Sequence, residues 1–73
     1  MSEYSRIITL AGARVSAGFT QQEAANRIHV TKVTMNNWEN GKTLPTADKA
    51  QEMADLYQIP LQLIIFGKKS TVV

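Results

Sequence analysis

Apolar residues recur at helical spacing in five segments of the chain, and polar or turn-forming residues separate these segments. Intervals of three and four positions between apolar residues are typical of amphipathic helices. We therefore predict an all-α domain of five helices with no strand. The predicted helices span residues 4–17, 20–28, 31–40, 46–57 and 60–65.

Capping and stop residues stand at the ends of these segments. Thr20 precedes Glu23 by three positions, which is the spacing of a capping box at a helix N-terminus. Single threonines can cap the third and fourth helices, and single glycines can end the first and third. These residues are Thr31, Thr46, Gly18 and Gly41.

Only His29 and Val30 separate the second predicted helix from the cap of the third. Two helices joined by a turn of three or four residues form a helix-turn-helix unit. The sequence therefore predicts a helix-turn-helix at about residues 20–40. We place it inside one domain, residues 1–67, followed by a short flexible tail, residues 68–73.

The third predicted helix has an unusual polar face. Met35 and Trp38 fall on one side of a helical projection and form its packing face. The other side carries Val33, Asn36, Asn37 and Asn40. Valine and asparagine are weak helix formers. Because stronger helix formers would stabilise an exposed face better, their presence here indicates that the face has a function. Asparagine amides suit base edges in the major groove, above all adenine, and valine suits a thymine methyl group. The alternative is an ordinary polar surface with one apolar residue.

Length and composition narrow the class of protein. The chain has 73 residues, which is enough for one compact domain, and it contains no cysteine. It therefore has neither a disulfide framework nor a thiolate zinc site. Nothing near the N-terminus reads as a signal peptide, and the apolar run at 61–66 is too short to span a bilayer. We expect a cytoplasmic protein without a membrane partner.

The net charge of +2 is too small to identify a nucleic-acid-binding protein, but the charges are unevenly distributed. The region between about residues 21 and 43 is basic and nearly free of acid. Its cations are Arg27, Lys32 and Lys42, whereas Asp48, Glu52 and Asp55 follow together in the fourth predicted helix. We interpret the acidic run as a solvated face kept away from DNA.

Several stretches of the chain together resemble the phage repressor and Cro family of helix-turn-helix proteins. The stretches are Thr20-Gln21-Gln22-Glu23-Ala24-Ala25, Val30-Thr31, Trp38-Glu39-Asn40-Gly41-Lys42, Pro45-Thr46, Met53-Ala54, Ile59 and residues 61–66. The resemblance covers about residues 4–66. It implies a five-helix lambda-repressor-like domain that reads double-stranded operator DNA, usually as a homodimer.

The resemblance also implies roles for individual residues. Lys32, Val33 and Asn37 occupy positions that usually touch base edges, and Asn36 is a second-tier candidate. The expected phosphate contacts are Gln21, Thr31, Thr34, Asn40 and Lys42. Arg14 and Glu39 stand at the spacing of the family's internal ion pair, which ties the first helix to the third.

Some positions depart from the family pattern. His29 stands where the turn usually has glycine, so it must adopt a left-handed backbone conformation. Ala13 replaces a larger aliphatic residue, and Gly12 weakens the same helix. Leu56 and Leu63 stand where the family often has small or charged residues.

Two other classes of function compete with DNA reading. Catalysis is not expected, because the single histidine has no Ser-His-acid partners and no paired carboxylates stand out; we also expect no cofactor and no metal. A protein-interaction role remains open, through an apolar patch formed by Leu56, Leu63 and Phe66 with Val72 and Val73. Such a patch suits a homodimer, or another phage repressor as the target of an antirepressor or modulator. An antitoxin that binds a toxin and its own operator is a further alternative.

Overall fold

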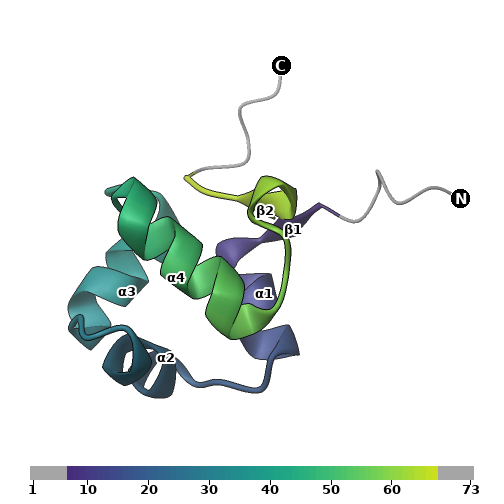
Figure 1. The fold of residues 1–73 in the computed structure, drawn as a ribbon. Coiled ribbons are helices and arrows are strands. Elements are labelled where there is room, and N and C mark those ends of the chain that lie inside the picture. The colour runs from purple at the N-terminus through teal and green to yellow at the C-terminus, as the bar shows by residue number, and fades with distance from the viewer. Residues whose placement is uncertain (1–6, 68–73) are drawn as a thin grey trace, which may run out of the picture.

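The computed structural model describes residues 7–67, which form a mostly helical fold (Figure 1). Within this range there are four α-helices rather than the expected five. In chain order the elements are β1 (Ile8–Thr9), α1 (Leu10–Ser16), α2 (Gln21–Arg27), α3 (Lys32–Asn40), α4 (Ala47–Tyr57), the 3-10 turn η2 (Leu61–Leu63) and β2 (Ile64–Ile65). The tail predicted at 68–73 lies outside the described residues, as do residues 4–6 of the first predicted helix.

The first helix begins later than predicted. Thr9 caps it, because its hydroxyl oxygen accepts a hydrogen bond from the Gly12 backbone N–H at 3.0 Å. Ile8 and Thr9 are extended and form β1. Both are β-branched, and such side chains favour strands over helices. Gly18 has a φ of +88°, so the predicted glycine stop is confirmed.

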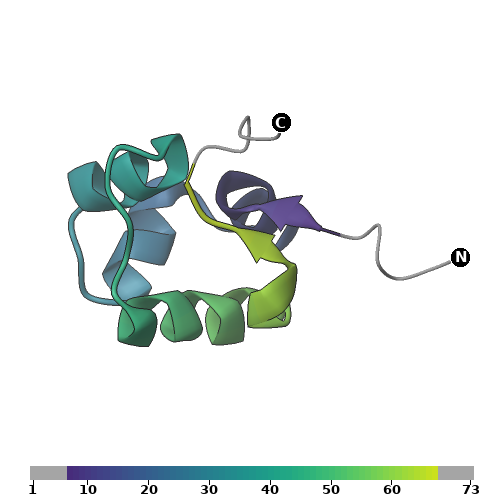
Figure 2. The same ribbon diagram turned by 90° about the horizontal axis from the view of Figure 1, so that it is seen from above.

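The prediction of a fifth helix and of no strand was wrong. Pro60 is followed by the single turn η2, and Ile64 and Ile65 then form β2. The strands β1 and β2 are parallel, with Ile8 paired to Ile64 and Thr9 to Ile65. The pair lies beside α1, away from the α2–α3 turn (Figure 2).

The predicted start and turn signals of α2 and α3 are confirmed. The Thr20 hydroxyl oxygen accepts from the Glu23 N–H at 3.0 Å, and the Glu23 carboxylate accepts from the Thr20 N–H at 2.9 Å. Thr31 caps α3, and Gly41 ends it with a φ of 78°. His29 holds the left-handed conformation expected of it, with a φ of 63°.

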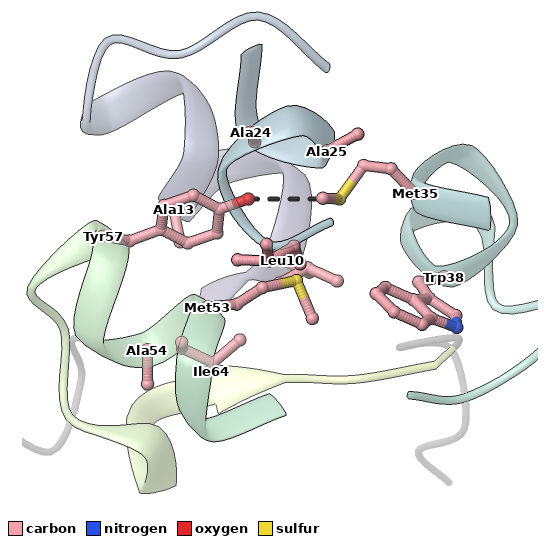
Figure 3. Packing of buried hydrophobic residues seen from close by; sticks show 11 residues of the cluster. Leu10, Ala13, Ala24, Ala25, Met35, Trp38, Met53, Ala54, Tyr57 and Ile64 are labelled. Carbon is pink, nitrogen blue, oxygen red and sulfur yellow. Dashed lines mark hydrogen bonds between the residues drawn. The ribbon is translucent and has the colours of Figure 1, made fainter. Parts of the chain in front are cut away.

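A single cluster of apolar side chains joins all four helices to β2. Leu10, Met35 and Met53 are its largest fully buried side chains, and Trp38 is also buried. Met35 and Trp38 therefore form the packing face that the helical projection predicts for α3. The Tyr57 hydroxyl lies 4.0 Å from the Met35 sulfur (Figure 3).

We expect the stability of the protein to fall between pH 10 and 12 because of Tyr57. Burial raises the pKa of Tyr57 to about 12, the negative charge of Glu39 adds to the rise, and Arg14 opposes it. Since the pKa in the folded state exceeds that of the unfolded chain, the stabilisation is complete below pH 10 and is lost as the pH rises towards 12. Urea unfolding should show a loss of about 2 kcal/mol that is absent from Tyr57→Phe. Equal losses in both proteins would contradict this assignment.

Candidate nucleic-acid interface

The face of α3 opposite the core is open to solvent. Lys32, Val33, Asn36 and Asn40 are exposed, and Asn37 is half-buried. Val33 leaves 68% of its surface accessible although it is apolar. Packing within the domain therefore does not account for valine at this position.

The beginnings of α2 and α3 enclose an open surface hollow. Its lining includes four residues assigned to DNA from the sequence: Gln21, Lys32, Val33 and Asn36. The helix-turn-helix thus brings together residues from two helices at one place. A base edge or backbone group that enters there meets amide, ammonium and methyl groups at once.

An ion pair lies behind this hollow. Arg14 Nε lies 2.6 Å from Glu39 Oε2, and Arg14 Nη2 lies 3.2 Å from Glu39 Oε1. Arg14 also donates to the Phe19 carbonyl at 2.8 Å. The hydrogen bonds to Glu39 raise the pKa of Arg14 above its ordinary value, although burial opposes the rise. The pair therefore fixes α3 against α1 as two opposite charges.

Gln21 connects the ion pair to the exposed face. Its Nε2 donates to Glu39 Oε1 at 2.9 Å and to Asn36 Oδ1 at 3.2 Å. The sequence alone suggests a phosphate contact for Gln21 and gives no sign of either bond. Gln21 and Asn36 stand 15 positions apart, so no local spacing indicates their contact.

The two threonines assigned to phosphate differ in their hydrogen-bonding state. The Thr31 hydroxyl accepts from the Thr34 N–H at 3.1 Å and donates to the Thr34 hydroxyl oxygen at 2.9 Å. Its oxygen therefore caps α3, and its proton is engaged by the Thr34 hydroxyl oxygen. The Thr34 hydroxyl keeps its own proton as a donor.

Asn40 and Lys42 flank the glycine that ends α3, and both are exposed. The Lys42 backbone N–H donates to the Asn37 carbonyl at 2.9 Å, which closes the last turn of the helix. The loop is thereby held close to α3. The side chains of Asn40 and Lys42 extend from a fixed backbone.

The acids of the basic region have internal partners. Glu39 pairs with Arg14, and Glu23 belongs to the capping box of α2. Lys32 and Lys42 are exposed cations on the α3 side, while the acidic run on α4 is also exposed. The exposed lysines on the α3 side would therefore attract an anionic ligand.

The turn between α2 and α3 has a support that no sequence pattern indicates. Lys49 of α4 donates from Nζ to the Ile28 carbonyl at 2.7 Å. Cations at a helix C-terminus satisfy free carbonyl groups and interact favourably with the helix dipole. Lys49 therefore ties the end of α2 to the first turn of α4.

The residues considered for a protein interface are only partly accessible. Leu56, Leu63 and Phe66 are half-buried, and Leu56 and Phe66 pack against the core. Val72 and Val73 lie outside the described residues. The most exposed large apolar side chains within residues 7–67 are Ile7, Val15, Val33 and Leu44.

The described part of the chain offers neither a cluster of metal-ligating side chains nor a membrane-spanning helix. Between residues 7 and 67, no three His, Cys, Asp or Glu side chains are grouped so that they could hold a metal ion. No helix in the same range is long and apolar enough to cross a membrane.

Comparison with known proteins identifies one family. The family model described as helix-turn-helix matches residues 10–64, from the first residue of α1 to the first residue of β2. The match includes every residue assigned here to DNA. Searches of curated proteins and of solved structures find no match.

Proposed function

Since the chain belongs to the Cro/C1-type helix-turn-helix family of DNA-binding transcription regulators, we propose that it reads operator DNA by inserting α3 into the major groove. The exposed face of α3 carries the proposal. A half-solvated row of asparagines with an accessible valine serves neither packing nor helix propensity. It does present amide groups that can hydrogen-bond base edges and methyl groups that can contact a thymine methyl.

Base reading is assigned to the side chains near the start of α3 and one turn later. Lys32 can donate to guanine acceptors, and Val33 can contact a thymine methyl group. Asn37 and Asn36 supply amides from the second turn. Their common surface includes the hollow beside α2.

Phosphate contacts position the domain without reading sequence. We assign them to Thr34, Asn40 and Lys42 through their side chains, and to Gln21 and Thr31 through their backbone N–H groups, because the side-chain protons of the last two are engaged within the protein. Lys42 is the cation of this set and Thr34 has a free hydroxyl proton. A homodimer on an inverted repeat would place half-sites about one helical turn (~34 Å) apart.

Sedimentation tests this function directly. The purified chain is run alone and then with DNA fragments from upstream of its own gene. An operator-binding regulator is supported if the protein sediments as a dimer and increases the sedimentation coefficient of one DNA fragment at moderate salt. A monomer that shifts none contradicts it and favours a modulator whose target is another repressor protein.

Asn37→Ala is expected to weaken operator binding by ~1–3 kcal/mol and to relax the preference at one base pair. The Asn37 side chain makes no hydrogen bond within residues 7–67, so the substitution removes no internal contact of that kind. Titration of DNA duplexes that vary at each pair in turn measures the effect. An unchanged profile would remove Asn37 from the groove.

Lys42→Ala is expected to weaken binding to all sequences by similar factors and to reduce the salt slope of log K by about one. The reason is that a phosphate contact releases a counterion and carries no sequence information. Titrations at several salt concentrations measure the slope. Lys42→Arg serves as the control, since it keeps the charge and should keep the slope; a slope unaltered in Lys42→Ala would place Lys42 away from phosphate.

A further inference from the structure

We propose that Asn36 reads its base pair as a hydrogen-bond donor, because a directional chain of hydrogen bonds beginning at Arg14 fixes the orientation of its amide. The inference rests on the proposed function, in which α3 enters the major groove. It goes further by giving Asn36 a defined polarity and Gln21 a positioning role. The observations are two parallel hydrogen bonds from Arg14 to Glu39, one from Gln21 to Glu39 and one from Gln21 to Asn36, which together link α1, α2 and α3.

The direction of the chain is set at its buried end. A guanidinium group can only donate hydrogen bonds, and an ionised carboxylate can only accept them. Arg14 donates to both oxygens of Glu39. The Glu39 side chain is only 5% exposed, so it does not exchange these partners for water. Glu39 Oε1 is therefore a fixed acceptor facing α2.

This acceptor determines which way the Gln21 amide lies. Gln21 approaches Glu39 Oε1 at 2.9 Å, and only Nε2 can donate across that distance. The opposite orientation would bring an amide oxygen against a carboxylate oxygen. Gln21 Nε2 is thus directed inward by the ion pair.

The second proton of Gln21 Nε2 then determines the orientation of Asn36. It is donated to Asn36 Oδ1 at 3.2 Å. One lone pair of that oxygen is engaged, and the oxygen faces Gln21. Asn36 Nδ2 lies on the other side of the amide, and its two protons have no side-chain acceptor within residues 7–67. On the exposed surface of α3, Asn36 therefore presents the two N–H groups of Nδ2 to a ligand, and its oxygen is turned towards Gln21.

The base edges of the major groove respond differently to such a group. Guanine presents two acceptors, N7 and O6, whereas cytosine presents only the N4 donor. An asparagine free to rotate its amide could serve either base. An asparagine held by Gln21 favours guanine and disfavours cytosine, because accepting from cytosine would require the amide to turn and break the chain.

This role of Gln21 differs from a phosphate contact in what it affects. Loss of a phosphate contact weakens all sequences alike. Loss of a positioning residue changes the preference at one base pair, the one that Asn36 reads. The two roles are separable by comparing base-preference profiles rather than affinities.

The test selects binding sites from a library of random DNA duplexes and then measures affinities for single-pair variants. Asn36→Ala identifies the base pair concerned. At that pair the unaltered protein should prefer guanine over cytosine by about tenfold. Gln21→Leu should reduce this ratio to about twofold while leaving the preferences at other pairs in place. Gln22→Leu is the matched control: Gln22 is the next residue of α2 and bonds Asn26 instead, so its profile should not change.

Three results would overturn the inference while leaving operator reading by α3 intact. These are a preference for cytosine at the Asn36 pair, an Asn36→Ala profile that equals the original, and a Gln21→Leu profile that keeps its shape while all affinities fall together. If the unaltered protein selects no sequence at all, the proposed function fails and the inference fails with it. Thermal unfolding followed by circular dichroism verifies that each variant compared is folded.

Discussion

Glu39→Ala is expected to lower the free energy of unfolding by about 3–5 kcal/mol. The Glu39 side chain is 5% exposed and that of Arg14 is 14% exposed, so the pair lies largely out of water. Removing the carboxylate leaves the guanidinium partly buried with the Phe19 carbonyl as its remaining acceptor. The cost arises mainly from this uncompensated charge rather than from the attraction that is lost.

Urea unfolding of the variant measures this effect. Glu52→Ala provides the matched control, because Glu52 also pairs with a cation, Lys49, at 3.4 Å but is 46% exposed. Exposed pairs of this kind contribute roughly 0–1 kcal/mol. Equal losses in the two variants would show that the burial of Glu39 has no energetic consequence.

Leu10→Ala is expected to lower the free energy of unfolding by about 3 kcal/mol. Leu10 is 2% exposed and lies in the middle of the apolar cluster, among side chains of α3, α4 and β2 (Figure 3). Truncation removes buried methyl groups and leaves a cavity among neighbours that belong to several elements. The neighbours cannot all move inward to fill the cavity, so both the transfer and the cavity contributions remain.

Leu44→Ala is the control for this experiment, since Leu44 is the same residue type but 65% exposed. Exposed substitutions away from special features usually change stability by less than about 0.5 kcal/mol. Urea unfolding of both variants gives the comparison. A loss in Leu44→Ala as large as in Leu10→Ala would mean that Leu44 is covered in solution.

The helix boundaries that the sequence predicts correctly have local causes. A capping box involves residues only three positions apart, and Thr20 and Glu23 form one. Gly41 and His29 likewise adopt left-handed conformations at the places where α3 and the turn require them. Such features depend on neighbouring residues and can be found without knowing the fold.

The strand pair could not be predicted in this way. Ile8 extends the apolar pattern of α1 backwards, and Ile64 and Ile65 extend that of η2 forwards. A strand of two residues is too short to show an alternating pattern. The preference for strand appears only when both segments meet beside α1, which is a property of the tertiary structure.

In the candidate site, too, some features follow from local sequence and others depend on the tertiary structure. The exposed and buried faces of α3 follow from helical periodicity, so Val33 and Met35 could be assigned to opposite sides. The engagement of Gln21 by Glu39 and Asn36 depends on how α2 and α3 pack. Sequence reasoning therefore identified the residues of the surface but not which of their atoms are free.

The pairing of Ile8 with Ile64 has a consequence for the order in which the chain assembles. The α2–α3 unit closes a short loop, whereas this pairing closes a loop that contains nearly all the described residues. The entropy lost on closing a loop rises with its length. We therefore expect α3 to pack against α2 before β1 pairs with β2, and the β1–β2 pair to be the first part of the domain to open.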